Sequence, residues 1–269
     1  MSTDREIDLD HVAVAMEDLR DGYPVYARDL GATYDGGGGG YGFTTGYYRF
    51  STSTMLESMM PINYEQMPFL RQFLDRFGAG PHHFTFACRS IADQIAVLES
   101  AGVPLTGISL DRPGVEEAFI SPKYGTGIVV QLTFGRDHSH PAPGDYPAPR
   151  AGVKRPADFL RVAHAVRDLD KMEHLFADLM HGEVTARGTD HDGRYVDVTW
   201  PGGTIRLVTP AAARTPLDEW LGERDARVHH YAMAVEEPAA IANVVVVGDG
   251  LYEIAPEHNA GTRIRVSER

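Results

Sequence analysis

The chain has 269 residues, of which 43% are hydrophobic, which is enough for one large domain or two ordinary domains with real cores. Its formal net charge of -13 argues against broad binding to nucleic acids or anionic membranes, because both need a cationic surface. The one cysteine, Cys88, excludes an internal disulfide and a thiolate metal cluster. We recognise neither a secretory signal nor a long apolar segment, so we expect a cytoplasmic protein.

The first predicted elements are a strand, a helix and a glycine-rich connection. Residues 9–15 form an apolar run that reads as a strand. Residues 18–30 fit an amphipathic helix with Pro24 in its first turn. The glycines at 36–40 lack the pattern of a phosphate loop and are too flexible for a strand interior. We therefore expect a mobile hairpin or the lip of a pocket at these glycines.

The following pattern gives two successive βαβββ units. Two strands complete the first unit, and a connector with a short helix leads to the second. The second unit has a strand, a helix and three more strands. The expected ranges are 47–50, 53–61, a helix at 69–74, 82–88, a helix at 91–101, 105–110, 117–121 and 127–134.

Four polar side chains interrupt the apolar strands of these units. They are His11, Glu57, His83 and Gln131. A lone histidine at the start of a strand is more often structural than a ligand, and His82 must point away from His83 because strand side chains alternate. Charged and amide groups in apolar strands nevertheless need partners. Two histidines, one carboxylate and one amide on four strands would satisfy each other around a divalent cation.

The order of these motifs resembles the vicinal oxygen chelate superfamily, which includes glyoxalases, bleomycin-resistance proteins and dioxygenases. The motifs are Leu-Asp-His-Val-Ala at 9–13, Leu-Glu at 56–57 before Pro61, His-His-Phe at 82–84, and Phe-Ile-Ser-Pro-Lys at 119–123 leading to Gly-Ile-Val-Val-Gln-Leu at 127–132. Within the superfamily, the N-terminal half is most similar to methylmalonyl-CoA epimerase and glyoxalase I. The resemblance implies an α+β fold in which βαβββ modules form cupped sheets.

The second half of the chain repeats the first in the same order. The repeated segments are 161–169 for 11–19, 205–210 for the Glu57 strand, 228–231 for the His83 strand and 261–267 for 125–131. We therefore expect a metal-binding domain at 1–135, a proline-rich linker at 136–157 and a second domain of the same kind at 158–269. His138 and His140 in the linker are interpreted as solvated residues rather than ligands.

The repeat also predicts which half holds the chemistry. Aligned on the repeated segments, the four polar residues become Arg161 for His11, Arg206 for Glu57, His230 for His83 and Ser267 for Gln131. Because arginine cannot ligate a cation, the second domain is expected to be degenerate and without a metal site. It is then either a structural pseudo-domain or a domain whose arginines bind a carboxylate or phosphate group.

For the first domain we predict one divalent ion, with His11, Glu57, His83 and Gln131 as its ligands. A set of nitrogen and oxygen ligands suits Zn, Ni, Co, Mn or Fe(II). Glu57 is the candidate catalytic base. Tyr47 or Tyr48 is expected to contact a small-molecule substrate, and alternation allows only one of them to face inward. The protein could also form a homodimer.

The resemblance implies an enzyme, a metal-dependent isomerase, epimerase or lyase that works through a metal-stabilised enolate of a small carbonyl or carboxylate compound, acyl-CoA included. The chain departs from the family at Gln131, where a glutamate is usual, and at 41–48, where the epimerases carry a further glutamate. Two alternatives stay open. One is a non-catalytic binding or antibiotic-resistance protein, and the other is an extradiol-type Fe(II) dioxygenase, although those enzymes usually hold their metal in the C-terminal half.

Overall fold

The structure, a computed structural model, describes residues 6–40, 42–111, 116–134 and 141–269, so that His138 and His140 lie outside the described residues. The strands and helices of the first half are β1 Ile7–Ala15, β2 Thr33–Gly39, β3 Phe43–Arg49, β4 Met55–Pro61, α1 Phe69–Phe77, β5 Gly80–Cys88, α2 Ile91–Ser100, β6 Leu105–Ser109, β7 Glu117–Ile120 and β8 Val129–Thr133. Those of the second half are β9 Asp158–Val166, α3 Leu169–Glu173, β10 Glu183–Thr189, β11 Gly193–Trp200, β12 Gly203–Pro210, α4 Pro216–Leu221, β13 Ala226–Val235, β14 Val244–Gly248, β15 Leu251–Ile254 and β16 Ile264–Glu268.

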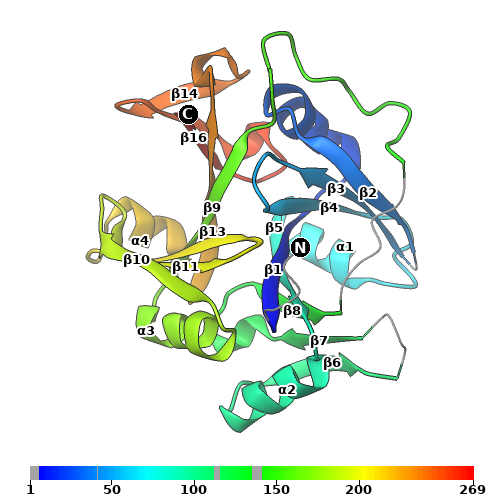
Figure 1. The fold of residues 1–269 in the computed structure, drawn as a ribbon, viewed down its shortest axis with the longest axis vertical. Helices are drawn as coiled ribbons and strands as arrows, with labels where there is room; N and C mark the ends of the chain where they lie inside the picture. Colours follow the sequence, from blue (N-terminus) through cyan, green and yellow to red (C-terminus); the bar gives the residue numbers. More distant parts are fainter. Residues whose placement is uncertain (1–5, 41, 112–115, 135–140) are drawn as a thin grey trace. The chain divides into compact units, whose positions relative to one another are not determined.

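Two eight-stranded mixed sheets organise these elements (Figure 1). The first sheet has the order β2-β3-β4-β1-β5-β8-β7-β6, and the second has the order β10-β11-β12-β9-β13-β16-β15-β14. Adding eight to each strand number of the first sheet gives the order of the second sheet. This identity confirms the internal repeat and the α+β fold class predicted from the sequence.

Contacts between Cα atoms divide the described chain into two compact units. One contains residues up to 10, 83–134 and 161–229, and the other contains 11–82, 141–160 and 230–269. The boundaries fall inside β1, β5, β9 and β13, so each of these strands contributes residues to both units.

Each unit has its own aromatic core. In the first, the rings of Phe86 and Trp200 lie 5.0 Å apart, and the Trp200 indole N–H donates to the carbonyl of Met180 at 2.9 Å. In the second, the ring of Phe159 lies 5.5 Å from that of Phe50 and 5.2 Å from that of Tyr231. Burial of large aromatic side chains provides the main stabilisation of such cores.

The segment predicted as one amphipathic helix at 18–30 is helical, but most of it is wound as a π-helix, which has a larger radius than an α-helix. It begins with a capping box at Asp18 and a 3-10 turn at Leu19–Gly22, and then continues as a π-helix at Tyr23–Asp29. The matching helix of the second half also ends in a π-helix, at His174–Leu179, and it contains no proline. The widening therefore belongs to the repeat and not to Pro24. Apolar periodicity in so short a segment does not distinguish the two kinds of helix.

The glycine run is a strand, which corrects the expectation of a hairpin or lip. Gly37 pairs with Gly46 and Gly38 pairs with Thr45, next to a register shift in β2. Gly37 has φ of 154°, and a Cβ built on it would lie 2.3 Å from the carbonyl oxygen of Thr45. Glycine is thus required here by close strand approach, a role that its flexibility does not reveal in the sequence.

The described part of the linker, 141–157, has no regular secondary structure. It is fastened by the Tyr146 hydroxyl, which donates to the carbonyl of Ala32 at 2.6 Å, and by the Ala157 N–H, which donates to that of Leu30 at 2.8 Å. Among the described residues, no helix has the length and apolar character that crossing a bilayer would require.

Candidate metal centre

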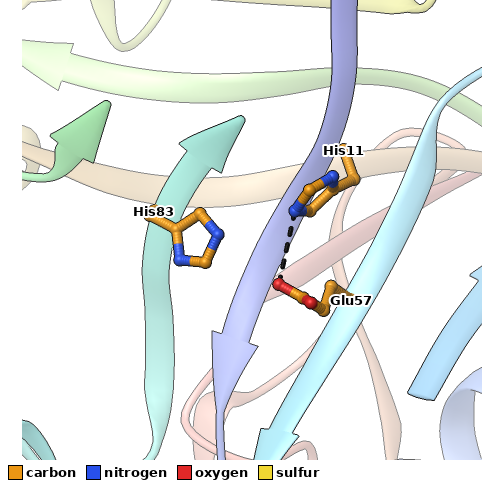
Figure 2. A group of neighbouring side chains, drawn as sticks. All are labelled: His11, Glu57 and His83. Atoms are coloured by element: carbon orange, nitrogen blue, oxygen red, sulfur yellow. Dashed lines mark ion pairs between the residues drawn. The ribbon is translucent and has the colours of Figure 1, made fainter. Parts of the chain in front are cut away.

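His11 and Glu57 are brought together by two parallel strands. In the pairing of β1 with β4, Glu57 lies opposite Ala13, two residues beyond His11 on the same face of its strand. The Nε2 atom of His11 lies 3.3 Å from Oε2 of Glu57, and both residues are buried (Figure 2). A buried carboxylate needs such partners, because an unpaired charge is unfavourable in a core.

His83 completes a group of three potential ligands. One ligand atom each from His11, Glu57 and His83 lies within 4.8 Å of the others, and all three residues are buried (Figure 2). His82 takes the opposite course and packs its ring 4.7 Å from that of Phe73. Burial lowers the pKa of His82 to about 4, against the opposing effect of the Glu57 carboxylate. His82 is therefore a neutral core residue.

Tyr47 supports Glu57 from the neighbouring strand. It lies directly opposite Glu57 in the pairing of β3 with β4, and its hydroxyl donates to Oε1 of Glu57 at 2.5 Å. This length is typical of a hydroxyl bonded to an ionised carboxylate. The Tyr47 ring also meets the His11 ring edge-on, with centroids 5.7 Å apart.

Tyr48 belongs to the core on the other face of β3. Its ring lies 5.3 Å from that of Tyr26, and its hydroxyl is 3.4 Å from the carbonyl oxygen of Leu19. Burial raises the pKa of the Tyr48 phenol, as expected for a hydroxyl in an apolar environment. Of the two tyrosines, only Tyr47 contacts the candidate ligands.

Gln131 lies on β8, where its amide is held at both ends. The hydroxyl of Thr85 donates to Oε1 at 2.9 Å, and Nε2 donates to Oε2 of Glu117 at 3.1 Å. Thr85 is two residues beyond His83, so Gln131 lies beside the face of β5 that carries His83. Oε1 keeps a second lone pair that could bind a cation.

Glu117 was missed in the sequence. It begins β7 and is half-buried, and only the antiparallel pairing of β7 with β8 brings it near Gln131. The sequence signal for Glu117 is the alternation of polar and apolar residues at the start of its strand. This alternation is also common on strands that face solvent, so it does not identify a site residue.

The registers of the second sheet test the alignment of the repeats. Arg206 lies opposite Ala163 as Glu57 lies opposite Ala13, so Arg206 replaces Glu57 and Arg161 replaces His11. Asp197 lies opposite Arg206 where Tyr47 lies opposite Glu57.

The equivalence of Gln131 with Ser267 is wrong. Gln131 pairs with Phe119 in β7, and the matching pair in the second sheet is Glu253 with Arg265. The residue in the place of Gln131 is therefore Arg265. A slip of two residues leaves side chains on the same face of a strand, so periodicity in the sequence does not reveal it.

A second group with ligand-type side chains lies in the C-terminal half. Ligand atoms of Asp192, His229 and His230 lie within 4.8 Å of one another. His229 and His230 are successive residues of β13, and one ring nitrogen of each lies within 4.8 Å of the other and of an Asp192 oxygen. The His229 ring also packs 4.8 Å from the Trp220 ring.

The donor set of the N-terminal group fits a divalent transition metal. Two imidazoles and one carboxylate, without thiolate, are the ligands that Fe(II), Zn, Co, Ni and Mn share. All three are carried on strands of the first sheet, which is the kind of rigid support that a metal site requires.

No protein-family model matches the sequence. An uncharacterised protein of Bacillus subtilis strain 168, YqjC, is 26% identical over 144 residues, which are 49% of this chain and 95% of that protein. A methylmalonyl-CoA epimerase from Mycobacterium tuberculosis matches 51% of this chain and 94% of its own, with 21% identity and a TM-score of 0.43.

A likeness that extends over nearly all of the chain is to a mutant of 4-hydroxymandelate synthase from Streptomyces coelicolor. The match covers 97% of this chain and 92% of that enzyme, with a TM-score of 0.63 and 16% identity. At 16% identity this similarity shows the fold but does not show the reaction. Together with the repeated strand order, it shows that the chain has the fold of the vicinal oxygen chelate superfamily.

Proposed function

We propose that the protein is a metalloenzyme that removes a proton next to the carbonyl or carboxylate group of a small substrate, as an isomerase, epimerase or lyase does. Acyl thioesters such as acyl-CoA are included among the substrates. The observation that carries the proposal is the buried group of His11, Glu57 and His83, whose ligand atoms lie within 4.8 Å of one another.

These three residues would hold one divalent ion, with Gln131 as a fourth ligand through Oε1. When bound, such an ion polarises a carbonyl group and stabilises negative charge on its oxygen. The ligand set suits Zn, Ni, Co, Mn and Fe alike, so the identity of the ion has to be measured.

Tyr47 is proposed to position Glu57 and to face the substrate. Its hydroxyl is bonded to Oε1 of Glu57, while His11 faces Oε2, so the carboxylate is held from both sides. A carboxylate oriented in this way is pre-organised for ligation. Substrate contact through Tyr48 has no such support, because that side chain packs on the other face of β3.

Two carboxylates are candidates for the proton acceptor. Glu57 can take this role only if its bond with Tyr47 loosens. Glu117 is half-buried and accepts one hydrogen bond from Gln131, so it has free acceptor capacity. We propose Glu57 first as a ligand, and Glu117 as a second acceptor that epimerisation would need on the opposite face of the substrate.

The test is hydrogen exchange at the carbon next to the carbonyl, followed by NMR in D2O with a panel of keto acids and acyl thioesters. The wild-type protein should exchange at least one substrate. Glu57→Gln should lose both the metal and the exchange, whereas Glu117→Gln should keep the metal and lose most of the exchange. If Glu57→Gln exchanges as fast as the wild type, the proposed reaction is wrong.

A second candidate is an Fe(II) oxygenase, which the same three residues favour. Two histidines and one carboxylate are the ligand set of many non-haem Fe(II) oxygenases. Iron in the purified protein, with oxygen consumption on catechols or 2-oxo acids and no proton exchange, would favour this candidate. A protein that takes up no metal would instead favour the non-catalytic binder. The homodimer and the cytoplasmic location stay predictions.

A further inference from the structure

Arg161 holds, in the second repeat, the strand position that His11 holds in the first. It lies on β9, two residues before Ala163, and Ala163 pairs with Arg206 in β12. Residues two apart on a strand share a face, so Arg161 and Arg206 are diagonal neighbours on the same side of the sheet. At this separation two long side chains come within electrostatic reach of each other.

The charge of Arg206 is already balanced. Its Nε and Nη2 atoms donate to the two carboxylate oxygens of Asp197 at 2.6 and 2.7 Å, and Nη1 donates to Asp190 at 3.1 Å. Its guanidinium also stacks over the ring of Tyr195, 3.7 Å from the ring centre. This fork-to-fork arrangement uses most of the donors that Arg206 has.

The charge of Arg161 has no comparable partner. Arg161 makes no hydrogen bond or ion pair with any residue in the described ranges, and its Nε atom is buried. Burial, followed by the nearby Arg206, lowers the pKa of Arg161 and outweighs the opposing effect of the Asp197 and Asp190 carboxylates, so that the surroundings on balance disfavour the cation. The side chain as a whole is half-buried, so a ligand can still reach the outer nitrogens. A guanidinium in this situation is stabilised by an anion.

We propose that Arg161 binds the carboxylate group of a small molecule in the C-terminal half of the protein. A planar guanidinium fork matches one carboxylate, and the neighbouring Asp190 and Asp197 carboxylates disfavour the larger charge of a phosphate dianion. The inference goes beyond the proposed enzyme function and does not depend on a bound metal. It assigns a role to the repeat in which arginines replace His11 and Glu57.

The probe is acetate, titrated into the full-length protein at neutral pH with sodium chloride of equal ionic strength as the reference. Thermal unfolding followed by circular dichroism should show a higher midpoint in acetate than in chloride. Arg161→Met should abolish this acetate effect, with a dissociation constant raised at least about tenfold, because a bidentate charge-assisted contact is lost. Arg161→Met should also unfold at a higher temperature than the wild type in chloride, since it removes a cation that burial and Arg206 on balance disfavour.

Arg194→Met is the matched control, because Arg194 is an exposed residue of β11, which is separated from β9 by β12, and this variant should keep the acetate effect. Arg161→Lys serves if the methionine variant does not fold, and it should bind acetate more weakly than the wild type because lysine has no fork. The inference fails if the wild type shows no acetate effect, if the Arg161 variants respond like the wild type, or if phosphate acts and acetate does not.

Discussion

Replacing Tyr47 by phenylalanine should destabilise the protein by removing the hydrogen bond between the Tyr47 hydroxyl and Glu57. The Tyr47 hydroxyl donates to a buried carboxylate at 2.5 Å, and Phe keeps the ring and its edge contact with His11. Hydrogen bonds to charged groups contribute about 1.5 to 3 kcal/mol, so we expect the free energy of unfolding to fall by about 2 kcal/mol. Glu57 keeps its contact with His11, at 3.3 Å, in this variant.

Tyr48→Phe is the matched control on the other face of the same strand. The Tyr48 hydroxyl is 3.4 Å from the carbonyl oxygen of Leu19 and interacts with the Ser58 hydroxyl, and both of these partners are neutral. Contacts with neutral groups contribute less than a bond to a carboxylate, so the loss of this hydroxyl should change stability by about 1 kcal/mol or less. Urea unfolding of both variants at neutral pH, followed by circular dichroism, measures the difference. An equal loss in the two variants, or a larger loss for Tyr48→Phe, would refute the assigned role of Tyr47.

Two further predictions concern stability. His164 is fully buried, with Nε2 2.9 Å from the carbonyl oxygen of Thr126, and burial lowers its pKa from 6.5 to about 4. Between these values only the unfolded chain takes up the proton, so stability falls as pH drops from 6.5 to 4, by up to about 3 kcal/mol for this residue. His82, whose pKa is also lowered to about 4, should contribute a similar loss of stability. Urea unfolding at pH 7 and pH 5 should show that acid lowers the free energy of unfolding less in His164→Gln than in the wild type. An equal decrease in the two proteins would contradict this prediction. Gly37→Ala should lower the unfolding free energy by more than about 1 kcal/mol, because its φ and a backbone carbonyl exclude a Cβ. Gly39→Ala, which meets no atom closer than 3.8 Å, should be nearly neutral, and equal midpoints for the two variants would count against the strand geometry.

The fold was predictable because the repeat is strong. Apolar strands with His11 and Arg161 at matching positions recur in the same order, and a repeated order constrains topology more than any local propensity does. Alternation also predicted that only one of Tyr47 and Tyr48 could reach the site, although not which one. That choice is made by the pairing of β3 with β4, which is a tertiary property.

Other features depend on pairing between strands that are distant in sequence. The contact of Glu117 with Gln131 and the equivalence of Gln131 with Arg265 both follow from the register of the last strands in each sheet. Register cannot be read from composition, because a two-residue slip preserves the pattern of buried and exposed positions. The use of Gly37 inside a strand was hidden for the same reason.

The domain boundaries at 135 and 158 stay a prediction. The two sheets follow the two halves of the sequence, whereas the compact units combine segments from both halves. Limited proteolysis within 141–157 would show whether either half remains folded alone.

The measurement that tests the central claim most directly is elemental analysis of the full-length protein, purified without an affinity tag and dialysed. We predict about one divalent ion per chain, bound through the nitrogen and carboxylate ligands of the N-terminal group. Glu57→Gln should lose the ion, and His230→Ala should retain it, since His230 belongs to the second repeat. An ion content that is unchanged in Glu57→Gln, or a wild-type protein that binds no metal even after reconstitution, would contradict the assignment of the metal centre.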